Sequence, residues 1–165
     1  MCGGIVVAYK LEDVDIDKKK TASNVRKFFA GEFITYLSRA GLHSTDLSSA
    51  NLDPTGIASR GKNSAESNIM KIFDYEAKCG AVYRCAQDCR ENENLGIYNR
   101  KILIYRYFQN IPDGDVKDRL GISSTAYAEK KLSALIDFAD RLPVWAYKFD
   151  TKLPELREFK NEELE

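Results

Sequence analysis

One stretch of the sequence decides the fold: IPDGDVKDRLGISSTAYAEKKLSALIDFADRL, from Ile111 to Leu142. Val116 and Leu120 stand four residues apart within it, and this spacing predicts a short helix from Asp113 to Leu120. Gly121 follows at once, and glycine adopts the left-handed backbone that ends many helices at the lowest steric cost. The stretch therefore predicts a helix and a tight turn, followed by a second helix.

The second helix is expected to run from the turn to Leu142. Ser123 or Ser124 would cap its start, because a serine hydroxyl accepts a hydrogen bond from an otherwise unpaired backbone N–H. Pro143 would end it, because proline lacks a backbone N–H and its ring clashes with the preceding turn. Apolar residues recur at steps of three and four, which predicts a buried face. That face comprises Tyr127, Ala128, Leu132, Ala134, Leu135, Phe138, Ala139 and Leu142.

The start of this second helix also presents short polar side chains and amines. Serine and threonine can bond any base edge of DNA, glutamate can accept from a cytosine amine, and lysine reaches guanine or phosphate. In a helix-turn-helix, the second helix enters the major groove with its first residues. We therefore expect a DNA-binding site comprising Ser123, Ser124, Thr125, Tyr127, Ala128, Glu129, Lys130 and Lys131. The alternatives are an ordinary helical hairpin with a solvated polar face and a helix-turn-helix that contacts protein.

Charged residues are balanced in number but separated along the chain. The 165 residues have a formal net charge of zero, which is unusual for a tight DNA binder. Basic residues from Lys18 to Lys27 have no acid among them, whereas acids crowd the first segment and the C-terminal tail. This pattern suggests a basic face offset by acidic ends, and a mixed, solvated surface is the alternative. A hydrophobic content of 44% is enough for a core, in one full domain or two small ones.

The cysteines do not have the spacing of a metal site. Cys2, Cys79, Cys85 and Cys89 form no CxxC pair, and the single histidine, His43, lies in a distant polar stretch. We expect no metal, and reduced, partly buried thiols in a cytoplasmic protein. No run approaches the roughly twenty apolar residues that span a bilayer, and the start lacks the features of a signal peptide. We expect no contact with a membrane.

Motifs of enzymes and cofactor sites are also missing. Gly56 to Lys62 resembles a phosphate-binding loop, but the Ser or Thr that should follow the lysine is absent. Asp113 to Asp115 resembles the start of a calcium loop, but the bidentate glutamate at the end is absent. The sequence therefore predicts a protein that is not an enzyme and that binds no cofactor.

Helical patterns cover most of the remaining chain, so we expect an all-α, multi-helix bundle. The expected domains are 1–64, an N-terminal helix and polar linker; 65–149, a helical DNA-binding domain; and 150–165, an acidic tail. The helix that ends at Ala40 should have an inward face comprising Val25, Phe29, Phe33, Tyr36, Leu37 and Ala40. The helix from Ala65 to Arg90 should have an inward face comprising Ile69, Ile72, Phe73, Cys79, Tyr83 and Ala86. The expected elements are a strand from Ile5 to Leu11, helices from Thr21 or Ser23 to Ala40, from Ala65 to Arg90, from Ile97 to Gln109 and from Leu153 to Leu164, and a loop from His43 to Ser64.

In its order of elements the chain resembles a family, the ArpU-type late transcriptional regulators of Gram-positive bacteriophages, which are relatives of the RinA activators. The resemblance covers most of the chain from Ile16 to Leu142. It is carried by IDKKKTASNVRKFF (Ile16 to Phe29), GKNSAE (Gly61 to Glu66), KILIYRYF (Lys101 to Phe108) and LGISSTAYAEKKLSALIDFADRL (Leu120 to Leu142). Over the last segment the family also looks like region 4 of bacterial sigma factors. The resemblance implies DNA binding near promoters and, by analogy, contact with RNA polymerase.

The sequence thus favours a sequence-specific DNA-binding regulator that activates late genes of a Gram-positive phage or phage-related mobile element. Its partners would be double-stranded operator or promoter DNA and bacterial RNA polymerase. A single motif makes few base contacts, so a homodimer or a second DNA contact is expected. Two alternatives stay open: an assembly protein like the small subunit of a phage packaging terminase, and a helix-turn-helix that binds polymerase without touching DNA.

Overall fold

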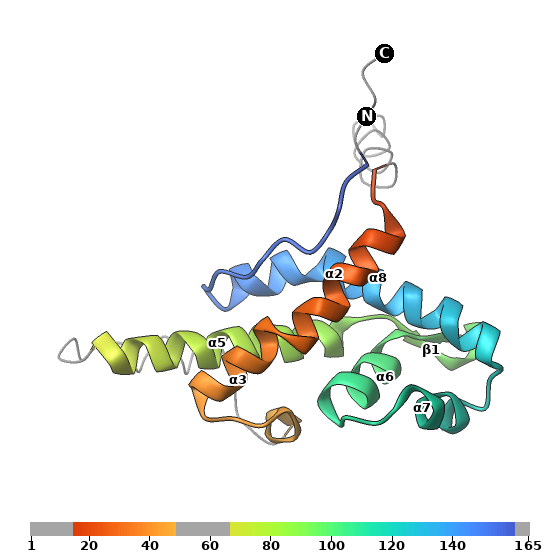
Figure 1. Ribbon diagram of the computed structural model, residues 1–165, viewed down its shortest axis with the longest axis horizontal. Helices are drawn as coiled ribbons and strands as arrows, with labels where there is room; N and C mark the ends of the chain where they lie inside the picture. The colour runs from red at the N-terminus through yellow and green to blue at the C-terminus, as the bar shows by residue number, and fades with distance from the viewer. Residues whose placement is uncertain (1–14, 49–66, 161–165) are drawn as a thin grey trace, which may run out of the picture.

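The computed structural model describes residues 15–48 and 67–160, which are mostly helical (Figure 1). The helices are α2 (Lys18–Ala30), α3 (Glu32–Ala40), α5 (Ser67–Asp88), α6 (Asn99–Leu103), α7 (Asp113–Leu120) and α8 (Ser124–Lys148). Two 3-10 helices, η1 (Ser44–Ser48) and η2 (Glu93–Leu95), and a π-helical segment, η3 (Ile104–Phe108), complete them. Strands β1 (Glu91–Asn92) and β2 (Ile97–Tyr98) form an antiparallel hairpin. The expected strand from Ile5 to Leu11 and most of the expected loop lie outside the described residues.

Helix α8 is the centre of the arrangement. Helix α5 lies along it on one side, α2 crosses it on another, and α6 packs against it before the chain enters α7 (Figure 1). Helix α3 continues from α2 and packs on α5. The described chain is therefore built around one long helix, as the expected helical bundle requires.

Aromatic rings join these helices. Phe138 of α8 is fully buried, and its ring lies 4.9 Å from that of Phe29 and 6.3 Å from that of Phe28, both of α2. Phe29 also stacks on Tyr107 of η3 at 4.2 Å and meets Phe108 edge-on at 5.9 Å. Such pairs add to the free energy gained by burying the rings. Elements far apart in sequence therefore share one aromatic centre.

The expected domain boundaries do not divide this core. Val25 from the first expected domain, Phe138 from the second and Leu156 from the tail all belong to one buried cluster. The apolar faces of α2 and α8 pack on each other, and this packing removes apolar surface from water that would stay exposed if the two helices were separate.

Helix α8 does not end before Pro143, so that expectation was wrong. The helix continues to Lys148 with the proline inside it. Trp145 and Phe149 pack against Ala77 and Ala81 of α5, and the Trp145 indole N–H donates to Asp88 at 3.1 Å. A proline removes only one backbone hydrogen bond and costs about 3 kcal/mol, which this packing offsets.

The expected tail helix was also wrong over the described residues. The chain from 151 to 160 is extended, and Phe159 pairs with Ile16 in an isolated bridge. The Asp17 N–H donates to the Glu158 carbonyl at 2.8 Å, and the Glu158 N–H donates to the Thr21 hydroxyl at 2.9 Å. Backbone groups that a helix would have satisfied are therefore paired with the start of α2.

The expected N-terminal helix differs at both its start and its middle. It begins at Lys18, because the Asp17 carboxylate accepts from the Lys20 N–H at 3.0 Å and caps it. It is then interrupted at Gly31, which ends α2 and precedes the first residue of α3. The expected end is confirmed, since Gly41 has a left-handed φ of 69° and caps α3. Beyond this interruption, α3 packs on α5.

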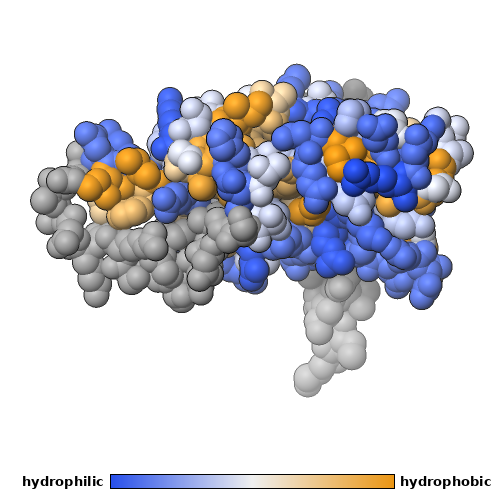
Figure 2. Space-filling view, turned by 90° about the horizontal axis from the view of Figure 1, so that it is seen from below, coloured by the Kyte–Doolittle hydropathy of each residue, from blue (hydrophilic) through white to orange (hydrophobic). Residues whose placement is uncertain are grey.

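Two further expectations about helices need correction. The helix expected from Ile97 begins at Asn99 and becomes π-helical at Ile104, since the hairpin takes its first two residues. Ile69 and Ile72 of α5 are not core: they are 39% and 42% exposed. The N-terminal end of α5 extends beyond its neighbours in Figure 1, and apolar surface gathers at that end in Figure 2.

Replacing Phe138 with alanine is expected to destabilise the fold by about 3–5 kcal/mol, because a cavity would open between α2 and α8. Urea unfolding followed by circular dichroism measures this free energy. The control, Ser133→Ala, changes an exposed residue of the same helix and should stay within about 0.5 kcal/mol of wild type. Equal stabilities of Phe138→Ala and wild type would contradict the central place of this ring.

Candidate nucleic-acid interface

The two helices expected around Gly121 are present, and α7 has the expected boundaries. Helix α7 spans Asp113–Leu120, and Gly121 ends it with a left-handed φ of 67°. Ser123 caps α8, because its hydroxyl oxygen accepts from the Ala126 N–H at 3.1 Å. Of the two serines proposed as the cap, the first therefore has that role.

Helix α7 is fixed to the core by one face. Val116 is fully buried, and Leu120 and Ile122 pack partly buried against the same cluster. A short helix of this length is not stable alone, so this burial holds it in place. The turn between α7 and α8 is thus a rigid part of the described fold.

A second set of contacts clamps the first turn of α7 to α8. The Asp113 carboxylate accepts from the Lys131 ammonium at 2.8 and 3.0 Å and from the Tyr127 hydroxyl at 2.6 Å. The Arg106 guanidinium lies 3.6 Å from the same carboxylate. Burial opposes ionisation of Asp113, but the hydrogen bonds from Lys131 and Tyr127 outweigh it and hold its pKa below the ordinary value. Lys131 and Tyr127 therefore orient α8 rather than project from it.

Lys130 is held by the hairpin, on a different side of α8 from Lys131. Its ammonium donates to the Gly96 carbonyl at 2.5 Å and lies 5.5 Å from the centre of the Tyr98 ring. A side chain at position 96 would place its Cβ 3.1 Å from this ammonium, so glycine allows the close approach. The backbone of Gly96 is also left-handed, with a φ of 68°.

The eight residues expected to bind DNA therefore have different environments. Ser123 is used as the helix cap, Tyr127, Lys130 and Lys131 are held by neighbours, and Ser124, Thr125, Ala128 and Glu129 are exposed. Ala128 was also expected to be core, which is wrong, because no described element covers this side of the first two turns of α8. The exposed residues place two hydroxyls, a methyl group and a carboxylate on one short surface.

Asp113 is a residue of this region whose role the sequence did not predict. The sequence showed it as part of an incomplete calcium loop. Its partner Lys131 is 18 residues away, and no periodic pattern links the two.

The described residues also bear on the expectations about metal ions, thiols and membranes. They contain no group of three or more histidine, cysteine, aspartate or glutamate side chains that could hold a metal ion. Burial raises the pKa of the Cys79 thiol to about 12, and Cys85 and Cys89 are buried as well. The Cys79 thiol therefore stays protonated at neutral pH. Within the same ranges, no helix combines the length and apolarity needed to cross a bilayer.

Comparison of the chain with family models, curated proteins and solved structures gave no significant match. The resemblance to ArpU-type regulators therefore rests on the quoted residues alone and stays a prediction.

The Asp113 clamp should make stability depend on pH. Because the folded pKa of Asp113 is lowered, its contribution is present above the ordinary value of 3.8 and is lost as the pH falls through the folded pKa. Asp113→Asn should therefore be less stable than wild type at neutral pH, and the difference should shrink on acidification below that value. Urea unfolding of both proteins across this pH range measures it. A difference that does not change with pH would contradict an ionised clamp.

Proposed function

We propose that the protein is a sequence-specific DNA-binding transcriptional regulator in which α7 and α8 act as a helix-turn-helix. The observation that carries the proposal is the exposed start of α8, presented by a rigid turn and anchored beneath by buried residues. Base readout requires such a surface, because side chains must be held in register with base edges in the major groove.

The exposed side chains suit base edges. Ser124 and Thr125 can donate to or accept from any base, Glu129 can accept from a cytosine amine, and the methyl group of Ala128 suits the thymine methyl. Lys130 and Lys131 were expected to contact DNA directly. In this proposal they have a positioning role instead, because both ammonium groups have partners within the protein. They fix the angle at which α8 meets the duplex.

The biological setting follows from the resemblance to ArpU- and RinA-type regulators and to sigma factor region 4. In that setting the protein activates late genes of a Gram-positive phage or phage-related element, within the host cytoplasm, and contacts RNA polymerase at the promoter. Binding as a homodimer to paired half-sites would supply the specificity that one short surface lacks.

The decisive experiment is selection of binding sites from a pool of random duplexes. Wild type should enrich one motif, and Glu129→Gln should change the preferred base at a single position, because an amide pairs with adenine where a carboxylate accepts from cytosine. Discrimination at that position should shift by about 1–3 kcal/mol. Asp150→Asn, which removes one acid beyond the far end of α8, should select the wild-type motif.

Failure has two distinguishable forms. A wild-type protein that enriches no motif would overturn sequence-specific DNA binding. An unchanged motif with Glu129→Gln would instead show that another surface reads the bases. Sedimentation separates the packaging alternative, since a regulator is expected to be a monomer or dimer and a packaging protein a closed ring of many subunits.

A further inference from the structure

Helix α2 presents a basic surface that the proposed reading helix does not use. Its apolar side packs on α8, and Lys18, Lys19, Lys20, Arg26 and Lys27 are all exposed. None of these five side chains takes part in an ion pair within residues 15–48 and 67–160. Lysine and arginine charges without acidic partners are available to an external anion.

The N-terminal end of α2 lies beside the first half of α8. A groove of about 430 Å³ is lined by Lys18 together with Glu129 and Ser133, which follow Thr125 at steps of four along α8. Arg90, from the base of the hairpin, lines the same groove. The proposed reading surface is therefore continuous with the N-terminal turn of α2.

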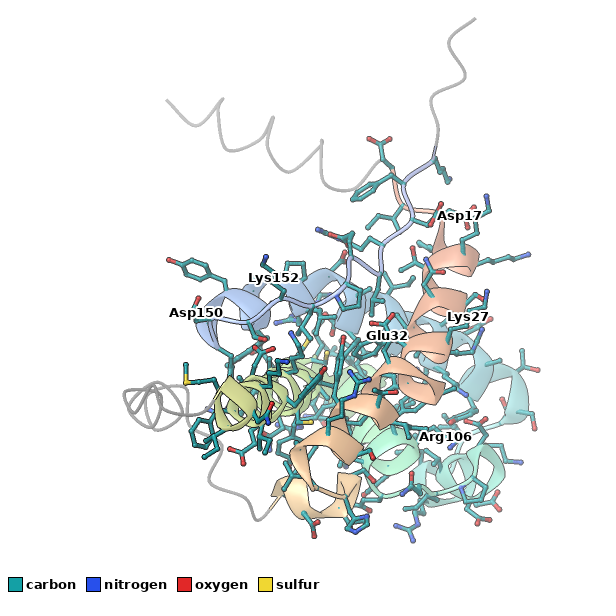
Figure 3. The ribbon with its side chains drawn as sticks, turned by 60° about the vertical axis from the view of Figure 1, so that its left-hand side comes forward. Asp17, Lys27, Glu32, Arg106, Asp150 and Lys152 are labelled. Atoms are coloured by element: carbon teal, nitrogen blue, oxygen red, sulfur yellow. The ribbon has the colours of Figure 1, made fainter. Side chains whose placement is uncertain are left out.

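The other end of α2 reaches the chain that leads into α7. A second groove, of about 820 Å³, brings Arg26 of α2 together with Arg106, Tyr107 and Asn110. The Arg106 guanidinium lies 5.6 Å from the centre of the Tyr107 ring, and Arg26 lines the groove beside them. Lys27 and Arg106 lie toward the same side of the molecule in Figure 3.

Acidic residues are distributed unevenly between these two grooves. Glu129, Asp137 and Asp140 line the first, whereas no acid is among the residues that line the second. Asp137 is already bonded to Arg141, Asn99 and the Arg90 N–H. A phosphate would therefore be repelled near Glu129 and attracted along the flank of α2 that carries Lys19 and Arg26.

Lys19 and Arg26 are seven residues apart, so they lie on one flank of α2 about 10 Å apart along its axis. One strand of B-DNA carries a phosphate for about every 3.4 Å of helix axis, so this flank can follow more than one phosphate.

We propose that α2 is a second DNA contact, in which Lys19 and Arg26 bind the sugar–phosphate backbone of the duplex whose major groove the start of α8 reads. This inference rests on the proposed function. It names a sequence-independent contact beside the sequence-reading one, and it explains how a chain of zero net charge can hold a polyanion.

The test measures binding of the full-length protein to a random-sequence duplex over a series of salt concentrations. Lys19→Gln with Arg26→Gln removes two positive charges from the flank, and the slope of log affinity against log salt should become shallower by about two units. The matched control is Lys71→Gln with Lys152→Gln, which removes two exposed charges elsewhere; Lys152 lies near the C-terminal end of α8, away from Lys27 (Figure 3). The control should keep the wild-type slope.

Circular dichroism and thermal unfolding should be unchanged in both double variants, since all four side chains are exposed. A wild-type slope and affinity in the Lys19 and Arg26 variant would overturn the second contact while leaving the reading helix intact. An equal loss in the control pair would also overturn it, because the effect would then come from net charge alone. Absence of binding by wild type, even at low salt, would overturn the proposed function together with this inference.

Discussion

The phenyl ring of Phe138 holds α2 and α8 together, and most other features of the fold depend on that contact. Its neighbours Phe28 and Phe29 come from α2, and Phe29 in turn stacks on Tyr107 of η3. Through these rings the crossing of α2 over α8 also sets the position of the chain that enters α7. The exposed start of α8 is held in place because the middle of the same helix is fixed by this packing.

Hydrogen bonds to two carboxylates fix how the apolar faces are positioned against one another. Asp137 accepts from the Arg90 N–H at 2.8 Å, the Asn99 amide at 3.0 Å and the Arg141 guanidinium at 2.6 Å, which ties the hairpin and α6 to α8. Burial opposes its ionisation, but these hydrogen bonds outweigh it and lower its pKa. Asp113 likewise ties the start of α7 to α8 through its hydrogen bonds from Tyr127 and Lys131. Hydrophobic contact alone would let the elements slide, whereas charged hydrogen bonds have a defined geometry.

The extended tail explains how α2 comes to face outward with its amines. Leu156 is buried, and the Asn24 amide of α2 donates to the Leu156 carbonyl at 3.1 Å. Together with the bonds of Glu158 to Asp17 and Thr21, this contact covers one flank of α2. The flank with Lys19 and Arg26 is left on the other side. The tail with its acidic residues and the flank with Lys19 and Arg26 therefore lie on different sides of α2.

The sequence by itself determined the local features. Gly121 and Ser123 predicted the turn before α8, and Gly41 predicted the end of α3, because a left-handed glycine or a capping hydroxyl acts within a few residues of its own position. The spacing of Val25, Phe29 and Phe33 likewise predicted a buried face, since helical periodicity is also local. Most of the helices and part of the candidate site could be derived on this basis.

Only the tertiary structure decided which polar side chains of the site are free. Lys130 is bonded to Gly96, 34 residues before it, and Lys131 to Asp113, 18 residues before it, so nothing in their own neighbourhood reveals these partners. The same holds for Pro143, which α8 tolerates because α5 packs against the turn that follows it. Contacts between residues distant in sequence exist only once the core has brought the helices together, and their energy can then override a local signal.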